Sequence, residues 1–468
     1  MTENKEENFE DETIVEFRFD KDAEKGWQWI PIRVRHDKTA QYKAGRKNYG
    51  NNYTTAQGVW ESIHNPITEH MLETGEDIPD EIIDDNVYYN KSGKRDISYL
   101  ESLRDFHNKY VKRKLIQNVS KKGDILIDMS VGKGGDLSKW IKSRLNFVFG
   151  IDYSKDNIEN RINGACARYL NDKKKTRIIP SVIFLAGDSS KNIRSGEAST
   201  GGERSEKIMK AIFGNGPKDE KEIGFGVYKN YGIAEEGFDV VSNQFSIHYF
   251  FKDRNTLNNF VRNVSECCKI GGHFIGTTYN GEKVYNELES ISKGESINIM
   301  DGEKKIWEIT KQYDNLVDGF KDDANCIGLQ IDVYQESINK VFPEYLVNFE
   351  YFISLLEHYG FVPLNIDESN AIGFNKSIGS FEELYDDMLK ETKQYKYKKN
   401  YYGKADKINL NEKQISFLNN YFIFKKIRDV DTESVFNTQT NEIIKKSTKK
   451  KIKKLGTKIK ISRKNQKK

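Results

Sequence analysis

The sequence lacks any long uninterrupted run of apolar residues, and its first dozen residues are acidic and polar. A membrane-spanning helix needs about 20 consecutive apolar residues, and a secretory signal needs a basic start followed by an apolar stretch. Since neither pattern is present, we expect a soluble, intracellular protein. Its 468 residues allow two or three domains with ample hydrophobic core.

Cysteine is also scarce, and the few cysteines show no paired Cys-x-x-Cys spacing; they are Cys166, Cys267, Cys268 and Cys326. Such spacing favours reduced thiols over disulfides or zinc ligands. The sequence therefore predicts no metal site.

Acidic residues are missing after Glu442, where the segment from Lys445 to Lys468 contributes 13 positive charges. Removing these charges from the formal net charge of +4 leaves −9, so an acidic body carries a basic tail. Residues 431–468 are expected to form a disordered tail, because so dense a charge resists burial. Its predicted partner is a polyanion, with a solubilising or localising role as an equally weighted alternative.

Composition divides the rest of the chain into an N-terminal segment (1–75), an acidic linker (76–98) and a main domain (99–430). Apolar strands and helices alternate along the main domain. The expected strands are 125–128, 147–152, 178–185, 238–245, 273–278 and 421–426, and the expected helices begin near residues 99, 136, 156 and 257. This alternation is typical of a doubly wound α/β sheet. Residues 189–236, rich in Gly, Ser, Lys and Glu, are predicted to be a surface insertion.

The stretch after the first expected strand reads Asp128-Met129-Ser130-Val131-Gly132-Lys133-Gly134-Gly135-Asp136. A strand, a Gly turn and a helix start are typical of a nucleoside pocket, which nicotinamide or flavin oxidoreductases and S-adenosylmethionine methyltransferases both use. The Asp136 carboxylate would repel a pyrophosphate but suits a sulfonium or amino group, which favours the methyl donor. Asp152, at the end of the next strand, suits the ribose hydroxyls, and Asp188 suits the adenine amino group.

Five motifs in order resemble those of the messenger RNA cap guanine-N7 methyltransferases, especially the large fused capping enzymes of big DNA viruses. The resemblance covers residues 88–426 and rests on Arg104-Asp105-Phe106-His107-Asn108 with Lys112, on 128–140, on Gln244-Phe245 with His248-Tyr249, on Pro343-Glu344-Tyr345-Leu346-Val347 and on Tyr421-Phe422-Ile423-Phe424. It implies a Rossmann-like class I fold, S-adenosyl-L-methionine as cofactor and the capped 5′ end of mRNA as partner. It also implies other capping domains or an accessory subunit as partners, and a viral factory in the host cytoplasm, or the virion, as the location.

The resemblance also implies site residues. The donor contacts would be Lys112, Ser130, Gly132, Asp136, Asp152, Asp188 and Gln244. The cap contacts would be Asn108, Lys133, His248, Tyr249, Glu344 and Tyr421. The family usually has Gly where this chain has Ser130, whose side chain would crowd the donor.

Methylation of guanine N7 removes no proton, because N7 carries a lone pair, so the predicted enzyme needs alignment and no general base. Glu344 suits the two N–H donors of the guanine edge, and Lys133 and His248 suit the triphosphate bridge or ribose. Read singly, these residues also have structural interpretations: His248 and Tyr249 as a packed strand end, Glu344 as a helix-start acid, Lys112 as a solvated lysine and Tyr421 as a core aromatic.

The N-terminal segment shows strand-like alternation in residues 27–35, followed by Arg35-His36-Asp37-Lys38. This segment resembles the end of a guanylyltransferase oligonucleotide-binding fold, in which Arg35, Asp37 and Lys38 would contact nucleotide phosphates. The chain has no Lys-x-Asp-Gly nucleophile motif, so guanylyltransferase activity is not expected. An accessory β module packed on the main domain is an equally tenable interpretation.

The predicted function is methyl transfer to guanine N7 of capped mRNA. Two alternatives stay open. One is a non-catalytic capping subunit that binds RNA or a partner, and Ser130 in the donor loop favours it. The other is a methyltransferase with another substrate.

Overall fold

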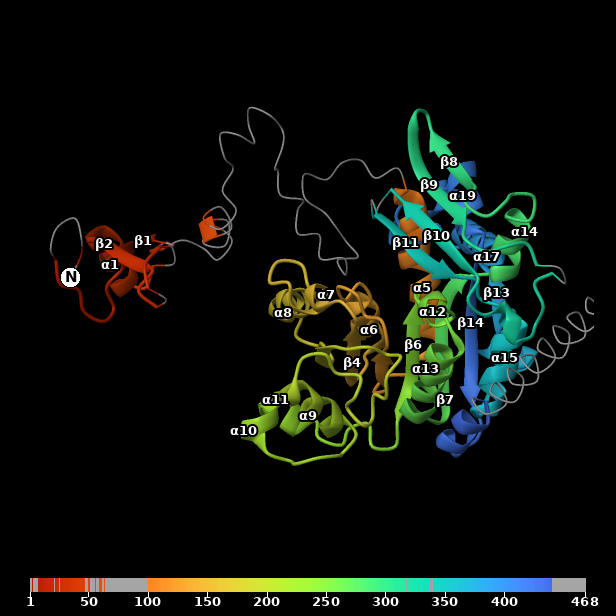
Figure 1. Ribbon diagram of the computed structural model, residues 1–468, viewed down its shortest axis with the longest axis horizontal. Helices are drawn as coiled ribbons and strands as arrows, with labels where there is room; N and C mark the ends of the chain where they lie inside the picture. Colours follow the sequence, from red (N-terminus) through yellow and green to blue (C-terminus); the bar gives the residue numbers. More distant parts are fainter. Residues whose placement is uncertain are drawn as a thin grey trace, which may run out of the picture. The chain divides into compact units, whose positions relative to one another are not determined.

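The computed structural model describes residues 100–316, 319–336, 338 and 340–439 of the main domain and its C-terminal extension. Nearer the N-terminus, the described residues are 7–20, 22–24, 26–46 and 49–50, together with Thr2, Thr55, Val59, Trp60 and Ile63. The chain forms two compact units, Met1–Asp85 and Asn86–Lys468 (Figure 1). The predicted linker and the cationic tail from Lys445 lie outside the described residues. Within the described residues no helix combines the length and apolar character needed to cross a membrane.

The first unit contains an antiparallel pair, β1 (Val15–Phe19) and β2 (Trp29–Val34), followed by α1 (His36–Lys43). The strand predicted in residues 27–35 is therefore confirmed, and β1 is its partner. The Trp29 ring packs edge-on against Phe19, with 5.1 Å between ring centroids, and stacks on Trp60 at 5.9 Å.

The second unit is built on one twisted sheet with strand order β12-β14-β7-β6-β3-β4-β5, and β13 pairs with β14. The strands are β3 (Ile125–Asp128), β4 (Phe147–Asp152), β5 (Ser181–Ala186), β6 (Phe238–Gln244), β7 (Cys268–Tyr279), β12 (Phe361–Pro363), β13 (Ile378–Ser380) and β14 (Asn419–Lys426). Strands β3 to β7 pair in parallel, and β14 pairs antiparallel to β7. The predicted doubly wound α/β fold is confirmed, and the strand order reverses direction at β3 and β6, where such folds bind ligands.

Helices cover both faces of the sheet. On β3, Ile127 belongs to one buried cluster and Leu126 to the other, because successive strand side chains point to opposite faces. The helices are α4 (Glu101–Asp105), the π-helix η1 (Phe106–Val111), α5 (Lys112–Val119), α6 (Leu137–Ser143), α7 (Lys155–Glu159), α8 (Ala165–Lys175), α12 (Ile247–Phe250), α13 (Arg254–Cys267), α14 (Gly281–Glu287), α15 (Phe349–His358), α16 (Ile366–Ala371), α17 (Phe381–Gln394), α18 (Lys398–Tyr402) and α19 (Leu410–Ser416), with short 3-10 turns η2 (Ala324–Cys326) and η3 (Ala405–Lys407).

The prediction that residues 189–236 form a surface insertion is wrong. This segment contains α9 (Glu203–Ile212), α10 (Glu220–Ile223) and α11 (Phe225–Lys229), and it connects β5 to β6. Met209, Ile212 and Phe213 are fully buried in the cluster that also holds Phe238 of β6. The segment therefore supplies the crossover between two parallel strands, and its polar composition belongs to its solvent face.

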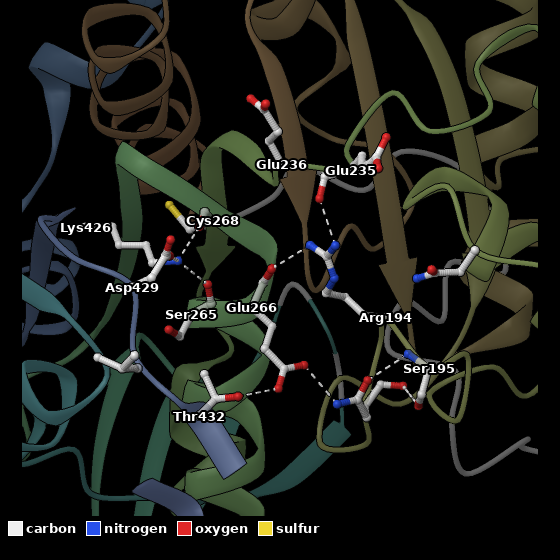
Figure 2. A pocket seen from close by; sticks show the side chains of 13 residues that line it. Arg194, Ser195, Glu235, Glu236, Ser265, Glu266, Cys268, Lys426, Asp429 and Thr432 are labelled. Atoms are coloured by element: carbon white, nitrogen blue, oxygen red, sulfur yellow. Dashed lines mark hydrogen bonds and ion pairs between the residues drawn. The ribbon is translucent and has the colours of Figure 1, made fainter. Parts of the chain in front are cut away.

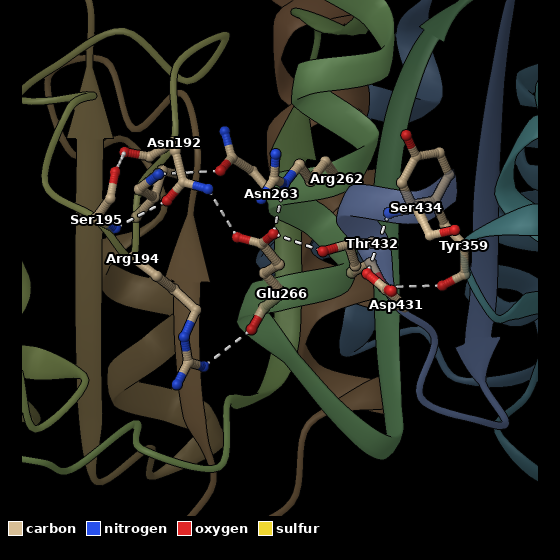
Figure 3. A network of polar contacts seen from close by, with 12 residues as sticks. Asn192, Arg194, Ser195, Arg262, Asn263, Glu266, Tyr359, Asp431, Thr432 and Ser434 are labelled. Atoms are coloured by element: carbon tan, nitrogen blue, oxygen red, sulfur yellow. Dashed lines mark hydrogen bonds and ion pairs between the residues drawn. The ribbon is translucent and has the colours of Figure 1, made fainter. Parts of the chain in front are cut away.

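The predicted start of the tail at residue 431 is also wrong. Residues 432–439 are helical, and the Thr432 hydroxyl donates to Glu266 Oε1 at 2.7 Å (Figure 3). Glu266 also accepts from Asn192 and Arg262, at 2.9 and 2.6 Å, which ties the crossover segment, α13 and this last helix together. The folded unit thus reaches at least residue 439.

A second sheet was not expected from the sequence. It is antiparallel, with order β11-β10-β9-β8, and is formed by β8 (Ser296–Asp301), β9 (Lys304–Lys311), β10 (Gln330–Gln335) and β11 (Lys340–Tyr345) (Figure 1). Its inward face carries Trp307, Ile309 and Ile331, which form a third buried cluster. Glu344 lies on β11 opposite Ile331, so the sheet carries this acid on the same face as the cluster.

Candidate functional site

The loop between β3 and α6 makes a turn that glycine allows. Gly132 and Gly134 have φ of 53° and 69°, in the left-handed region that side chains disfavour. A Cβ placed on Gly132 would meet no atom within 4 Å, so open space lies beside the turn. The loop therefore leaves room for a ligand at the carboxyl edge of the sheet.

Asp152 supports this loop from the end of β4. Its carboxylate accepts hydrogen bonds from the Gly132 amide at 2.7 Å, the Ser154 amide at 3.0 Å and the Asn157 side chain at 2.9 Å. Burial raises the pKa of Asp152, and these hydrogen bonds oppose the rise. The acid thus holds the turn, and its contact with the ribose hydroxyls stays a prediction.

Asp136 lies buried between two lysines. Its carboxylate oxygens are 2.8 Å from Lys112 Nζ and 2.7 Å from Lys139 Nζ. Burial opposes ionisation of Asp136, but the two ammonium groups lower its pKa to about 2. The structure brings together Lys112 and Asp136, two of the residues predicted to contact the donor. It adds Lys139, whose spacing of three residues from Asp136 on a helix start was the available signal.

The other predicted donor residues lie at neighbouring strand ends. Asp188, after β5, accepts from the Ser190 amide at 2.9 Å and from the Ser190 hydroxyl at 2.6 Å. Gln244 ends β6, where its amide donates to Ser242 at 3.2 Å and its carbonyl accepts from Thr277 at 3.2 Å. Both side chains have fixed orientations at the edge where the Gly turn lies.

Ser130 does not project freely into the loop. Its hydroxyl contacts the Ser246 hydroxyl, and the Asn243 amide donates to it at 3.2 Å. Ser246 in turn donates to Asn243 Oδ1 at 3.0 Å. This network holds the Ser130 hydroxyl against the end of β6. The loop can therefore accommodate a side chain where the family usually has glycine.

Glu344 and His248 form a buried polar pair. Glu344 Oε2 lies 3.6 Å from His248 Nε2, which is too long for a hydrogen bond, and the two residues are only 6% and 4% exposed. Within the described residues, Glu344 Oε2 and both ring nitrogens of His248 have no hydrogen-bond partner. The Tyr249 ring lies edge-on to His248, with centroids 4.3 Å apart. Buried polar groups of this kind are normally satisfied, so the pair indicates a ligand site.

Burial shifts the ionisation of both members of this pair in the direction of the neutral form. It raises the pKa of Glu344 to about 8 and lowers the pKa of His248 to about 3. Near neutral pH a protonated carboxyl therefore faces a neutral imidazole.

This pKa shift predicts how Glu344 affects stability. In the unfolded chain the carboxyl has its usual pKa of 4.5, so between that pH and about 8 the folded protein binds the extra proton and loses stability as pH rises. Glu344→Gln replaces this carboxyl with a neutral amide, so the variant has no charge to bury at high pH. We expect the variant to match the parental protein near pH 4.5 and to exceed its unfolding free energy by about 4 kcal/mol at pH 9. Denaturant titrations at both pH values measure this, and a variant that is less stable at pH 9 would contradict it.

Three predicted cap contacts have other surroundings. Asn108 lies in η1, a π-helix of the type that is frequent at functional sites, and its amide donates to the Arg104 carbonyl at 3.0 Å. Lys133 is buried, with its ammonium 2.9 Å from Asn163 Oδ1 and 3.3 Å from Asp156 Oδ2. Lys133 therefore contacts Asn163 and Asp156, not Glu344 or His248.

Tyr421 is a core residue. Its hydroxyl donates to the Lys376 carbonyl at 3.0 Å, and its ring packs against Phe374 in a buried cluster. The structure thus places Lys133 and Tyr421 in contacts that stabilise the fold. The motif positions alone did not show where these side chains point.

Phe245 was missed as a site residue, although it lies within one of the motifs. It has φ of 56°, which costs free energy for a bulky residue, and its amide donates to Thr277. Its ring stacks on His107, with centroids 5.2 Å apart. This strained residue directly follows Gln244, so the backbone here presents its ring at the same sheet edge. The sequence contains no signal for the strain.

A cavity of about 620 Å³ lies at the opposite edge of the sheet, near the starts of β6 and β7 (Figure 2). Its cations are engaged: the Arg194 guanidinium donates to the Glu266 and Glu235 carbonyls, and the Lys426 ammonium donates to the Ser265 and Cys268 carbonyls. This arrangement fits a structural role.

The comparisons with known proteins agree with the geometry. A family model described as mRNA (guanine-N(7))-methyltransferase domain matches residues 84–427, most of the chain. This chain belongs to the mRNA (guanine-N(7))-methyltransferase family. Residues 1–73 match a model of the C-terminal domain of mRNA capping enzymes, which confirms the resemblance of the N-terminal segment.

The chain matches only part of the length of each relative. A probable mRNA-capping enzyme of Acanthamoeba polyphaga mimivirus is 28% identical over 92% of this chain and 38% of its own length. The mRNA cap guanine-N(7) methyltransferase of Saccharomyces cerevisiae is 29% identical over 57% of this chain and 52% of its own length. That of Arabidopsis thaliana, mRNA cap guanine-N(7) methyltransferase 1, is 27% identical over 57% and 60%. The chain thus spans less than two thirds of each.

The family assignment confirms S-adenosyl-L-methionine as the cofactor, and the residues at this edge fit it. The open turn at Gly132 provides space, Asp152 provides a carboxylate for hydroxyl donors, and Asp136 with its two lysines provides both charges for a zwitterionic amino acid end.

The N-terminal motif belongs to the first unit. There, the Arg35 guanidinium pairs with Asp37 at 3.3 Å and with Glu16 at 3.5 Å, and the Lys38 ammonium lies 3.3 Å from the Gln41 side-chain oxygen. Its predicted phosphate contacts stay a prediction.

Proposed function

We propose that this chain transfers the methyl group of S-adenosyl-L-methionine to N7 of the guanine cap of mRNA. The observation that carries the proposal is the Glu344 and His248 pair, buried and without hydrogen-bond partners among the described residues. The pair belongs to a chain of the guanine-N7 methyltransferase family.

Guanine fits this pair chemically. Its N1–H and 2-amino groups are adjacent donors that one carboxylate accepts together, whereas adenine offers a ring nitrogen acceptor at the N1 position. Binding of guanine replaces the missing hydrogen bonds of Glu344 and favours its ionised form, so cap binding near neutral pH should release a proton. The neutral His248 ring offers a further N–H beside the carboxylate.

The chemistry requires orientation, because N7 attacks with a lone pair and loses no proton. The bound cofactor supplies an electrophilic methyl group. Asp152, Asp136 and Lys112 hold the donor, and Glu344 fixes the guanine plane, which lowers the barrier by alignment. Methylation leaves the guanine cationic, and the Glu344 carboxylate opposite it stabilises that charge.

A selectivity measurement tests this proposal. We expect the chain with bound S-adenosylhomocysteine to bind GpppA at least 10-fold more tightly than ApppA, since adenine cannot satisfy the carboxylate. Equal affinity for the two dinucleotides would contradict a guanine site at Glu344.

We propose that this chain acts at the capped 5′ end of mRNA together with guanylyltransferase and triphosphatase domains or an accessory subunit, in the host cytoplasm or the virion if the chain is viral. The match of residues 1–73 to a capping-enzyme domain and the mimivirus relative support this setting.

The basic segment from Lys445 to Lys468 is proposed to add a sequence-independent attraction to RNA. Deleting it should weaken binding to long capped RNA and flatten the salt dependence, because fewer counterions are released. Methylation of a cap dinucleotide should hardly change. Salt titrations of full-length and truncated protein measure this, and equal slopes on long RNA would leave solubility or localisation as the role.

A further inference from the structure

Tyr279 is the last residue of β7, at the sheet edge where the candidate site lies. On one side, β7 pairs with β6 through Thr277 and Gln244, a predicted donor residue. On the other side, Tyr279 packs against the cluster that includes Ile331, the direct cross-strand neighbour of Glu344. The Glu344 carboxylate is close enough to raise the pKa of the Tyr279 phenol, after the larger effect of burial. Tyr279 thus lies between the donor edge and Glu344.

Trp307 fixes the direction of the Tyr279 hydroxyl bond. The Trp307 indole N–H donates to the Tyr279 oxygen at 3.2 Å, and Trp307 is buried on β9. An indole has one N–H and no acceptor, so the Tyr279 oxygen accepts here and its own proton must be donated elsewhere. Among the described residues no acceptor receives that proton. Tyr279 is partly buried, so this proton is available to an acceptor on a bound ligand.

We propose that the Tyr279 hydroxyl donates to O6 of the cap guanine and is a specificity-determining residue of the methyl transfer. This inference rests on the proposed function and adds a residue to it. Guanine presents O6 as an acceptor next to its N1–H, so a donor beside the Glu344 carboxylate completes the recognition of one edge. O6 is also the neighbour of N7, so a contact to O6 from the β7 edge brings N7 to the side where the methyl donor binds. Trp307 acts as a positioning residue, since it orients the hydroxyl without touching the base.

The test combines variants with modified substrates. We expect Tyr279→Phe to lower kcat/KM for GpppA about 10-fold while the dissociation constant of S-adenosyl-L-methionine stays unchanged. The parental protein should lose a similar factor on 6-thio-GpppA, whose sulfur is a poor acceptor. Tyr279→Phe should lose nothing more on that substrate, because the same hydrogen bond is already absent. On the inosine cap, which lacks only the 2-amino group, both proteins should lose the same factor.

Controls separate the possible failures. Tyr285→Phe alters a buried tyrosine of the same cluster, whose ring stacks on Tyr313, and should leave all rates at the parental level. Trp307→Phe keeps an aromatic side chain of smaller size but removes the N–H, and should raise KM for GpppA without changing donor binding. Equal losses on 6-thio-GpppA for the parental protein and Tyr279→Phe, or an unchanged rate for Tyr279→Phe on GpppA, would overturn the assignment of O6. A parental protein that methylates none of these caps would instead overturn the proposed function.

Discussion

Glu344→Gln should lower kcat/KM for cap methylation by about 100-fold and leave the affinity for S-adenosyl-L-methionine near the parental value. The glutamine keeps the size of the side chain, but it loses the charge and turns an amide toward the N–H donors of guanine. Breaking one partner of a buried charged hydrogen bond costs about 2 to 5 kcal/mol, which covers a loss of this size. Single-turnover methylation of GpppA and calorimetry of donor binding measure the two quantities separately.

Glu350→Gln is the matched control for this experiment. Glu350 is an exposed acid in the first turn of α15, six residues further along the chain, and its replacement should change neither quantity. If Glu344→Gln methylates GpppA at the parental rate, Glu344 only supports the structure of β11.

Asp152→Ala should weaken S-adenosyl-L-methionine binding by about 2 kcal/mol, or roughly 30-fold. The carboxylate is predicted to bind both ribose hydroxyls, and it also holds the Gly132 amide that shapes the turn. Asp152→Asn keeps the side-chain volume and one acceptor oxygen, so it should fold even if the alanine variant does not. It should still lose most of the affinity for S-adenosyl-L-methionine. Calorimetry with S-adenosylhomocysteine measures the loss in both variants.

The control for Asp152 is Glu159→Gln, an exposed acid on the adjacent helix α7. It should bind the donor as the parental protein does. Unchanged affinity in a folded Asp152 variant would remove this residue from the donor site.

The parallel sheet was predictable because its strands are buried on both faces and therefore read as short apolar runs, such as Ile125–Asp128 and Phe147–Asp152. The Gly turn and the acids at strand ends follow from the same register, because parallel strands end at one edge of the sheet. Asp136, Asp152 and Gln244 could therefore be placed together from sequence.

The second sheet could not be predicted, because its strands mix charged and apolar residues. Lys311 is buried on β9 although it is charged, since its ammonium donates to the Leu288 and Ile291 carbonyls at 2.9 and 2.8 Å. Such compensation depends on loops distant along the chain. For the same reason a motif identified Glu344 but did not show that it lies on a strand.

Side-chain direction was the other missing information. Lys133 pairs with Asp156 and Tyr421 bonds to a backbone carbonyl, and neither partner is signalled by the local sequence. Conversely, the strained backbone of Phe245 and the Trp307 bond to Tyr279 appear only in three dimensions.

Methyl transfer to GpppA-capped RNA tests the central claim most directly. Protein is incubated with S-adenosyl-L-methionine carrying a radiolabelled methyl group, and the RNA is digested so that the methylated atom can be identified. We predict label in 7-methylguanosine of the cap, reduced to about 1% of the parental rate by Glu344→Gln. Label on another atom, or no transfer by folded parental protein that binds the donor, would contradict the account.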